Sequence, residues 1–388
     1  MKRSMLIIGL GTVGFPSLEL LAQNPEFSKH HNRVVACSLD EAMGIRRVNT
    51  ARTLAQVNGL FPNIEFQRID LLNVSETAEI LKRYEPSLIF ANATLLRSGT
   101  FGFLPPDLAS KIREAGLGFL VPCHIALIYK LMLSIKEAGI KPLVINSSIP
   151  DITGPMLRKK GIGFEVGIGN IANYAPRLRY ILRRKLKVHP EKIKLYWYMH
   201  HSGIAKIATT GTTGGVPYIL RIYIGEKDVT SLFDPSNEIM KTQDIGWPYL
   251  LKVSDHNYNH ITAMSAYRTV MSIWNDSSST FYAPSPRGLP GGYTVTLGNE
   301  GAESILPDDV SIEDAIEVNE VGSRLDGVER IEDDGTLVLT EKACHIVKEA
   351  LDLDLKTVRI DNCEKMASEL LSHFEELAER YGAKMNTH

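Results

Sequence analysis

The first 150 residues alternate short apolar runs with stretches of helical spacing. The apolar runs predict buried strands at Met5–Ile8, Arg33–Ser38, Ile64–Ile69, Ser87–Ala91 and Pro142–Asn146. Helical spacing follows from Gly14 onward, over Glu76–Arg83, and in two pieces over 105–139 that are split near Gly116–Pro122. Buried strands that alternate with helices are typical of a parallel sheet covered by helices on both faces. The pattern predicts an α/β fold with a doubly wound parallel sheet.

The pattern changes after Pro150. It predicts helices over Arg177–Lys187, Asn259–Trp274 and Asn362–Tyr381, strands over Lys194–Met199 and Pro217–Ile224, a turn and strand over Gly288–Leu297, and a loop over Thr209–Gly215. The acidic, polar segment Ile305–Gly335 is expected at the surface. We therefore expect two domains, with residues 1–150 forming the parallel sheet and residues 151–388 forming an α+β domain.

Composition excludes several classes of protein. The chain has 388 residues, of which 44% are apolar and 23% charged, and a net charge of −2. This charge gives no basic footprint for nucleic acid, and we see no apolar run near the roughly 20 residues that cross a bilayer. The four cysteines are too widely spaced for a zinc pattern or a disulfide framework, so we expect no metal. The first strand begins by Met5, which predicts no signal peptide and a cytoplasmic location.

A glycine motif follows the first predicted strand directly. Gly9, Gly11 and Gly14 enclose Leu10, Thr12 and Val13 in a Gly-x-Gly-x-x-Gly pattern that opens a predicted helix. In this context Gly9 permits the turn, Gly11 lets the backbone approach a diphosphate, and Gly14 lets helix and strand pack closely. The motif predicts a dinucleotide-binding domain of the Rossmann type. A purely structural glycine turn is the alternative.

The choice between NAD and NADP depends on the end of the second strand. An NAD site places a carboxylate there to bind the ribose, whereas a 2′-phosphate needs that charge removed and a cation nearby. Ser38 ends the strand, Asp40 lies two residues later, and Arg46 and Arg47 follow. If Ser38 faces the ribose, NADP is favoured, and if Asp40 does, NAD is. We favour NADP, although paired arginines are more often a solvated helix face.

Two parts of the chain resemble lactate and malate dehydrogenases. The resemblance covers roughly residues 1–25 and 144–204, in order and spacing rather than close identity. It lies in the glycine motif and in Val144–Thr153, Gly167–Asn170, Arg177–Tyr180, Lys187–Pro190 and Tyr198–Gly203. It implies a nicotinamide cofactor, an active site between two domains, and a homo-oligomer, either a dimer or a tetramer.

The resemblance also implies roles for single residues. His201 is similar to the general acid-base histidine, Arg177 to the arginine that grips a substrate carboxylate, and Asn146, with a one-residue offset, to an asparagine near the nicotinamide. Arg97 lies where these enzymes carry a mobile loop arginine, with a surface arginine as the alternative. The aspartate expected three positions before Arg177, which would orient the histidine, is replaced by Tyr174. Tyr174 either hydrogen-bonds His201 or only packs.

The segments Phe61–Leu71 and Pro86–Ala93 resemble the cofactor domains of saccharopine dehydrogenases and extended short-chain dehydrogenases. This second resemblance implies that Asp70 lies near the adenine amino group and that Ala93 lies beside the cofactor. A loop or helix N-cap role is the alternative for Asp70. His200 and His201 end a predicted strand, so we expect their side chains to point to opposite faces, with one of them in a cleft.

These observations together predict an NAD(P)-dependent oxidoreductase that moves a hydride between nicotinamide and a carbonyl, alcohol or imine carbon of a small carboxylate-bearing substrate. Two alternatives remain open. Family 4 glycosidases resemble the same dehydrogenases but need a metal held by cysteine and histidine, and no cysteine lies near Asn170. The missing aspartate suggests the other alternative, a non-catalytic dinucleotide-binding sensor. The polar segment Asp255–His260 is interpreted as a loop, with or without a substrate contact.

Overall fold

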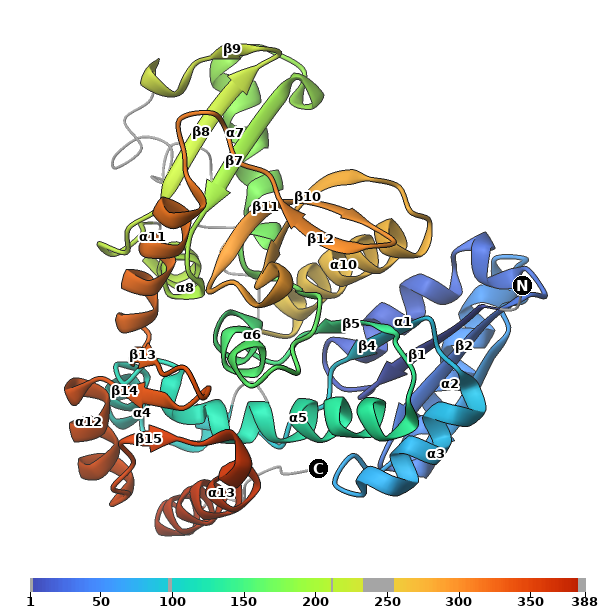
Figure 1. Cartoon of the computed structure of the whole chain (residues 1–388), viewed down its shortest axis with the longest axis horizontal. Helices are drawn as coiled ribbons and strands as arrows, with labels where there is room; N and C mark the ends of the chain where they lie inside the picture. Colours follow the sequence, from blue (N-terminus) through green and yellow to red (C-terminus); the bar gives the residue numbers. More distant parts are fainter. Residues whose placement is uncertain (1–2, 97–99, 211, 233–254, 383–388) are drawn as a thin grey trace.

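A computed structural model describes residues 3–96, 100–210, 212–232 and 255–382. Its N-terminal part is a six-stranded parallel sheet in the order β3-β2-β1-β4-β5-β6 (Figure 1). The strands are β1 (Arg3–Ile8), β2 (Asn32–Ser38), β3 (Ile64–Arg68), β4 (Leu88–Ala91), β5 (Leu143–Asn146) and β6 (Val166–Gly167). This arrangement confirms the predicted doubly wound sheet. The order of the strands reverses between β1 and β4, and in doubly wound folds such a reversal opens a crevice at the carboxyl ends of the strands.

Each face of this sheet has its own helices. The helices of this part are α1 (Gly14–Ala22), α2 (Glu41–Val57), α3 (Val74–Tyr84), α4 (Pro106–Arg113) and α5 (Val121–Ala138). Alternate residues of β1 point to opposite faces, so that Met5 packs in one core with Leu18 of α1, and Leu6 packs in another with Leu81 of α3. The split of residues 105–139 into two helices is as predicted.

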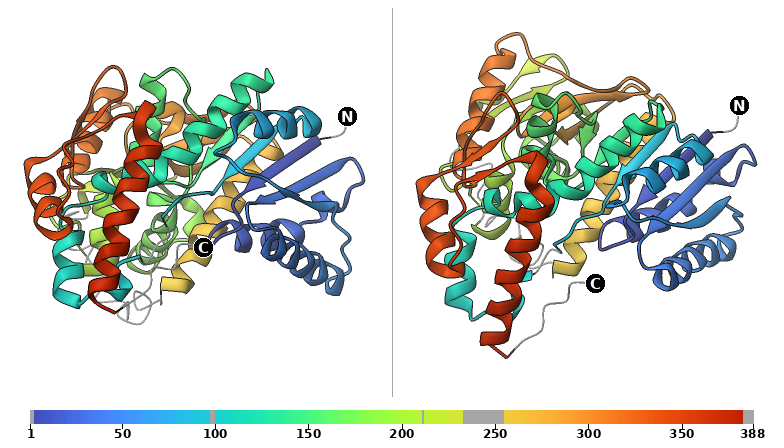
Figure 2. Two further views of the ribbon diagram at one scale, coloured as in Figure 1. Left: turned by 90° about the horizontal axis from the view of Figure 1, so that it is seen from below. Right: turned by 60° about the horizontal axis from the view of Figure 1, so that its bottom comes forward.

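One of these helices is apolar enough to cross a membrane. The helical stretch Gly118–Ala138, which includes α5, has a mean hydropathy of 1.7, contrary to our expectation that no run comes near this limit. In the structure 72% of its apolar window is buried. It packs against α3 on one side and against α13 (Cys363–Arg380) on the other (Figure 2). Burial by protein on both sides explains its composition, because a helix that is apolar all round is suited to a core position.

The second half of the described chain mixes helices with small antiparallel sheets. The three-stranded sheets are β7 (Ile193–Tyr198), β8 (Ile219–Ile224) and β9 (Lys227–Asp228); β10 (Ser279–Pro284), β11 (Gly292–Gly298) and β12 (Gly301–Ser304); β13 (Val328–Ile331), β14 (Leu337–Leu339) and β15 (Thr357–Val358). The other helices are α6 (Pro150–Lys159), α7 (Ala175–Leu186), α8 (His201–Thr210), α10 (Asp255–Trp274), α11 (Ile312–Arg324) and α12 (Glu341–Leu351). This part is the predicted α+β region.

Late segments of the chain also cover the first sheet. Helix α10 lies against α1, where the Asn24 amide donates to the Tyr267 hydroxyl at 2.7 Å. The guanidinium of Arg3 lies 4.0 Å from the ring centre of Trp274. Strand β6 belongs to the parallel sheet, although it follows residue 150. The domain boundary at residue 150 remains a prediction.

Two local predictions are wrong, and a third is partly correct. Residues Asp255–His260 begin a helix, α10, rather than a loop. The predicted loop Thr209–Gly215 is confirmed at residues 212–215, whereas Thr209 and Thr210 end α8. The segment Ile305–Gly335 is not a plain surface stretch, because it forms α11 and β13 and contains a buried carboxylate, Asp326. At Asp326, packing against distant elements overrides local polarity, which a single sequence does not display.

Candidate functional site

The glycine turn joins β1 to α1 at the crevice. Gly9 has φ +91°, and a Cβ there would lie 2.6 Å from the Ala93 nitrogen. A Cβ on Gly14 would lie 1.9 Å from the Gly9 carbonyl oxygen, whereas a Cβ on Gly11 would meet nothing within 4 Å. Gly9 and Gly14 are therefore required by packing, and Gly11 borders open space. The turn has the shape that a diphosphate needs on the Gly11 side.

The start of α1 presents backbone donors in the same place. Gly11 and Thr12 are exposed, and Val13 is the N-cap residue, with no side chain that caps the helix. The first N–H groups of a helix have no partner within the helix and sit at the positive end of its dipole. An anion placed beside Gly11 would therefore meet Thr12 and Val13 at the open end of α1.

The last residue of β2, at the carboxyl end of the strand, is Ser38 and not an acidic residue. The Ser38 hydroxyl donates to the Asp40 carbonyl at 2.9 Å. The Asp40 carboxylate accepts from the Met43 N–H at 2.9 Å, and so caps α2. The Arg47 guanidinium donates to the Leu10 carbonyl and so lies against the glycine turn. The acidic group nearest to the predicted ribose position is thus engaged in a helix cap.

Asp70 and Ala93 border this part of the crevice in different ways. The Asp70 carboxylate accepts from the Leu72 N–H at 3.0 Å, and its carbonyl accepts from the Thr77 hydroxyl at 3.1 Å. These bonds build the turn before α3, whose N-cap is Asn73. Ala93 lies directly behind Gly9. Arg97 lies outside the described residues.

A histidine and a buried carboxylate meet at the start of α8. The Nδ1 atom of His201 lies 3.8 Å from Oδ2 of Asp326, and the His201 side chain is 37% exposed while that of Asp326 is 8% exposed. The other oxygen of Asp326 accepts from the Leu117 N–H at 3.0 Å. Burial lowers the pKa of His201, but the Asp326 and Asp151 carboxylates outweigh it, so the pKa lies above its usual value. His201 is therefore a partly exposed imidazole backed by a buried anion.

Asp151 fixes the backbone of the same histidine. It lies in the first turn of α6, is 4% exposed, and accepts from the His201 N–H at 3.2 Å. The Asn170 amide donates to the same carboxylate oxygen. Sequence analysis assigned no role to Asp151 or to Asp326. Asp326 is thus a carboxylate beside His201, and it comes from a segment that we expected at the surface.

The two neighbouring histidines do not diverge as we expected. Strand β7 ends at Tyr198, and α8 begins at His201, so strand alternation does not apply to this pair. The Nδ1 atom of His200 also lies near Asp326, 3.9 Å from Oδ2, and 3.2 Å from the Ser202 hydroxyl oxygen. His200 is fully buried, and burial lowers its pKa. The exposed His201 is the one that a small molecule can reach.

Three other predicted site residues lie in well-defined surroundings. Asn146 is fully buried. Its amide donates to the Ser148 carbonyl and the Thr153 hydroxyl and accepts from the Ser148 N–H, so its hydrogen bonds lie within the turn between β5 and α6. The Arg177 guanidinium lies 4.9 Å from the ring centre of Tyr174, at the start of α7. Tyr174 is buried, and burial raises the pKa of its hydroxyl. The Tyr174 ring thus forms a cation–π contact with Arg177.

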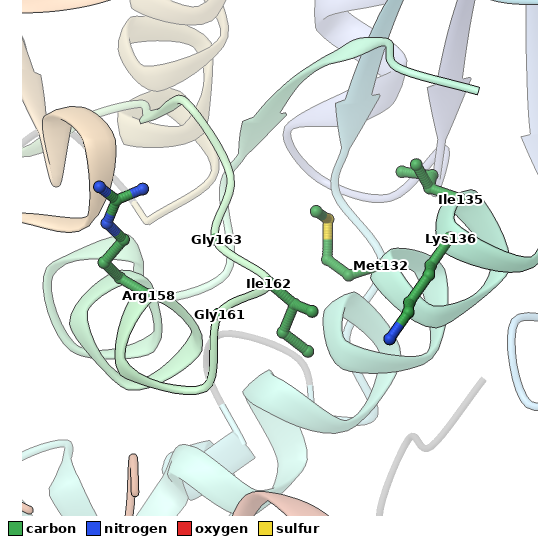
Figure 3. Close-up of a pocket in the computed structure, with 7 residues that line it drawn as sticks. All are labelled: Met132, Ile135, Lys136, Arg158, Gly161, Ile162 and Gly163. Atoms are coloured by element: carbon green, nitrogen blue, oxygen red, sulfur yellow. The ribbon is translucent and has the colours of Figure 1, made fainter. Parts of the chain in front are cut away.

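A separate hollow of about 420 Å³ lies between α5 and the end of α6. Figure 3 shows Met132 and Ile162 between the side chains of Lys136 and Arg158. It lies on the C-terminal half of α5, whereas the crevice lies at the N-terminal end of that helix. Among the described residues, no group of three or more histidine, cysteine, aspartate or glutamate side chains is placed to hold a metal ion.

Comparisons with known proteins define the fold. No family model matches the chain, and no curated protein matches it. The structure resembles malate dehydrogenase from Plasmodium falciparum, with a TM-score of 0.55, 15% identity, and coverage of 89% of this chain and 100% of that one. It also resembles lactate dehydrogenase from Eimeria maxima with NADH and oxamate, with a TM-score of 0.53, 15% identity, and coverage of 83% and 91%.

A third solved structure agrees with these two. The minor L-lactate dehydrogenase from Enterococcus mundtii, in a ligand-bound form, gives a TM-score of 0.53 and 14% identity, and covers 85% of this chain and 99% of that one. At such low identity these likenesses establish the fold. They confirm the predicted lactate and malate dehydrogenase-like architecture, while the resemblance to saccharopine and short-chain dehydrogenases stays a prediction.

The geometry of the glycine turn predicts opposite effects for two alanine substitutions. We expect Gly14→Ala to lower the unfolding free energy by about 1–3 kcal/mol, because its methyl group would overlap the Gly9 carbonyl. Gly11→Ala should change the unfolding free energy by less than about 0.5 kcal/mol, because its methyl group enters open space. Denaturant unfolding of both variants measures this difference. Equal loss of stability in the two variants would contradict the assignment.

Proposed function

We propose that the chain is an NAD(P)-dependent oxidoreductase. The observation that carries the proposal is the glycine turn at the crevice between β1 and β4, with Gly11 beside open space and the uncapped start of α1 next to it. Ligands of doubly wound folds bind at this switch point, and a diphosphate at a helix N-terminus is stabilised by backbone donors. The dehydrogenase neighbours support the same conclusion, and the lactate dehydrogenase from Eimeria maxima was solved with NADH.

The proposed reaction is reversible hydride transfer between nicotinamide and a carbonyl, alcohol or imine carbon of a small, carboxylate-bearing molecule. The nicotinamide supplies or accepts the hydride. His201 donates a proton to the substrate oxygen or nitrogen in reduction and takes it back in oxidation, a role that suits an imidazole with a pKa near neutrality. The Asp326 carboxylate, 3.8 Å from Nδ1 of His201, favours the protonated ring through its charge. Arg177 is the proposed cation for the substrate carboxylate, because a guanidinium matches a carboxylate in shape and charge.

The position of Asp326 bears on the sensor alternative, which rested on the absence of an aspartate partner for the histidine. A buried carboxylate lies 3.8 Å from His201, so this reason no longer applies.

We keep a homo-oligomer and a cytoplasmic location as parts of the proposal, because the resemblance and the composition imply them. The cofactor titration that tests the whole proposal uses NADH and NADPH with the wild-type chain. Neither fluorescence change nor thermal protection with either would overturn it.

The first variant removes the proposed acid-base group. We expect His201→Ala to lower turnover by roughly two to four orders of magnitude, because positioned proton transfer contributes about that much. NADH or NADPH affinity should stay within a few-fold of wild type. Turnover is measured with a panel of 2-oxo acids and dinucleotide affinity by fluorescence titration. Unchanged turnover of any substrate in the variant would remove His201 from the mechanism.

The second variant tests the partner of that histidine through pH dependence. Carbonyl reduction needs protonated His201, so its rate falls as pH rises through the pKa that Asp326 holds above the usual value. Asp326→Asn removes the charge, so we expect this fall to move to lower pH by about one unit or more. Asp333→Asn, at a fully exposed position, is the matched control and should leave the profile unchanged. A profile that coincides in all three proteins would exclude an electrostatic role for Asp326.

The third variant addresses cofactor choice, where we propose a preference for NADP. Ser38 offers a hydroxyl and no charge, and Arg47 brings a cation to the glycine turn. Ser38→Asp should repel a 2′-phosphate and bind the ribose hydroxyls, so the ratio of NADPH to NADH affinity should fall about tenfold or more. Titration of both proteins with both dinucleotides gives this ratio. A wild type that prefers NADH a hundredfold would contradict the proposed preference.

A further inference from the structure

A cluster of three polar side chains lies at the crevice, outside the residues considered so far. Nδ1 of His124, in the first turn of α5, lies 3.1 Å from the Ser148 hydroxyl oxygen and 3.2 Å from the Thr94 hydroxyl oxygen. Thr94 follows β4, and Ser148 follows β5. These strands are neighbours in the sheet, so the cluster sits directly at their carboxyl ends. Sequence analysis assigned no role to His124.

His124 is a partly exposed residue among buried ones. It retains partial exposure, whereas Val121, Pro122, Cys123 and Ile125 around it are buried. Burial of the ring lowers the pKa of His124 to about 4. The imidazole is therefore uncharged at neutral pH, with one nitrogen as donor and the other as acceptor.

Both hydroxyls of the cluster engage the same nitrogen of the ring, Nδ1. The Thr94 hydroxyl also has two backbone acceptors, the Leu96 carbonyl at 3.1 Å and the Cys123 carbonyl at 3.2 Å. The hydrogen bonds of the described residues give the Ser148 hydroxyl no acceptor other than Nδ1. Since Nδ1 is engaged by these two hydroxyls, Nε2 is the ring nitrogen that a ligand meets, as a donor in one tautomer and as an acceptor in the other.

Contacts around the crevice show which part of a dinucleotide would meet His124. Ala93, next to Thr94, packs on Gly9 of the glycine turn. On the other side Ser148 is followed by Asp151, which bonds the backbone of His201. His124 thus lies between the diphosphate position and the proposed acid-base histidine. In a doubly wound fold the half of a dinucleotide that passes β4 and β5 is the nicotinamide riboside.

We propose that Nε2 of His124 forms a hydrogen bond with the nicotinamide riboside half of the dinucleotide, with Thr94 and Ser148 holding the ring at Nδ1. The hydrogen-bonding groups of that half are the ribose hydroxyls and the carboxamide. The inference rests on the proposed function and deepens it. It makes His124 a cofactor-positioning residue, distinct from His201.

The experiment uses His124→Phe, which keeps a ring and loses both ring nitrogens, and measures affinity by calorimetry for NADH, ADP-ribose and AMP, or for their 2′-phosphorylated counterparts. We expect NADH affinity to fall about tenfold, the value of one well-placed hydrogen bond, and AMP affinity to stay unchanged because AMP lacks this half. If a ribose hydroxyl is the partner of Nε2, ADP-ribose weakens as much as NADH does. If the carboxamide is the partner, ADP-ribose binds as in the wild type.

Two further variants separate this role from a structural one. His124→Gln restores a side chain that both donates and accepts hydrogen bonds and should recover most of the NADH affinity, whereas His345→Phe, at a side chain that is 80% exposed, should behave as wild type. A His124→Phe protein that binds NADH within twofold of wild type would overturn the inference alone. Equal loss of AMP and NADH affinity in both His124 variants would also overturn it. A wild type that binds no dinucleotide would overturn the proposed function as well.

Discussion

The buried carboxylate of Asp326 is the group around which the candidate site is organised. A charge removed from water is costly unless hydrogen bonds and opposite charge compensate it. Its partners come from separate parts of the chain, the Leu117 N–H ahead of α5 and the two histidines at the start of α8. The backbone is fitted just as closely, because the Gly118 N–H donates to the Asp326 carbonyl and a Cβ on Gly116 would lie 2.2 Å from the same residue. The start of α5, the start of α8 and the segment after α11 are therefore held together by one residue.

Much of the fold follows from local pattern, and the reason is physical. A buried parallel strand must be apolar on both faces, so β1 appears in the sequence as an unbroken run from Met5 to Ile8. Gly9 and Gly14 appear as glycines because backbone atoms occupy the space of their side chains. These requirements act between residues close in sequence, and they can be predicted from one chain. The lengths of α5 and α13 follow in the same way from their apolar spacing.

The carboxylate partner of the histidine could not be predicted in this way. Ile305–Gly335 contains many acidic residues, and their side chains look alike in the sequence. What distinguishes Asp326 is Gly327, which has φ +85° and would place a Cβ 2.1 Å from the Ala115 carbonyl oxygen. That contact joins residues far apart in the chain. An Asp-Gly pair is a local signal, but Asp334 and Gly335 form the same pair in this segment, and there the aspartate is exposed, as in most such turns. The start of α8 at His201 likewise depends on Asp151, which is distant in sequence.

The two histidines of the crevice differ because their surroundings shift their pKa in opposite directions. Carboxylates outweigh burial at His201 and raise its pKa, whereas at His124 burial acts beside uncharged hydroxyls and lowers it. The His201 ring is therefore protonated more readily than an ordinary imidazole, and the His124 ring stays uncharged at neutral pH. An active site needs both kinds of group, one to change charge during the reaction and one to hold a ligand without changing. The same side chain performs either task, and at these two positions the difference is that the Asp326 and Asp151 carboxylates raise the pKa of His201, whereas burial alone sets that of His124.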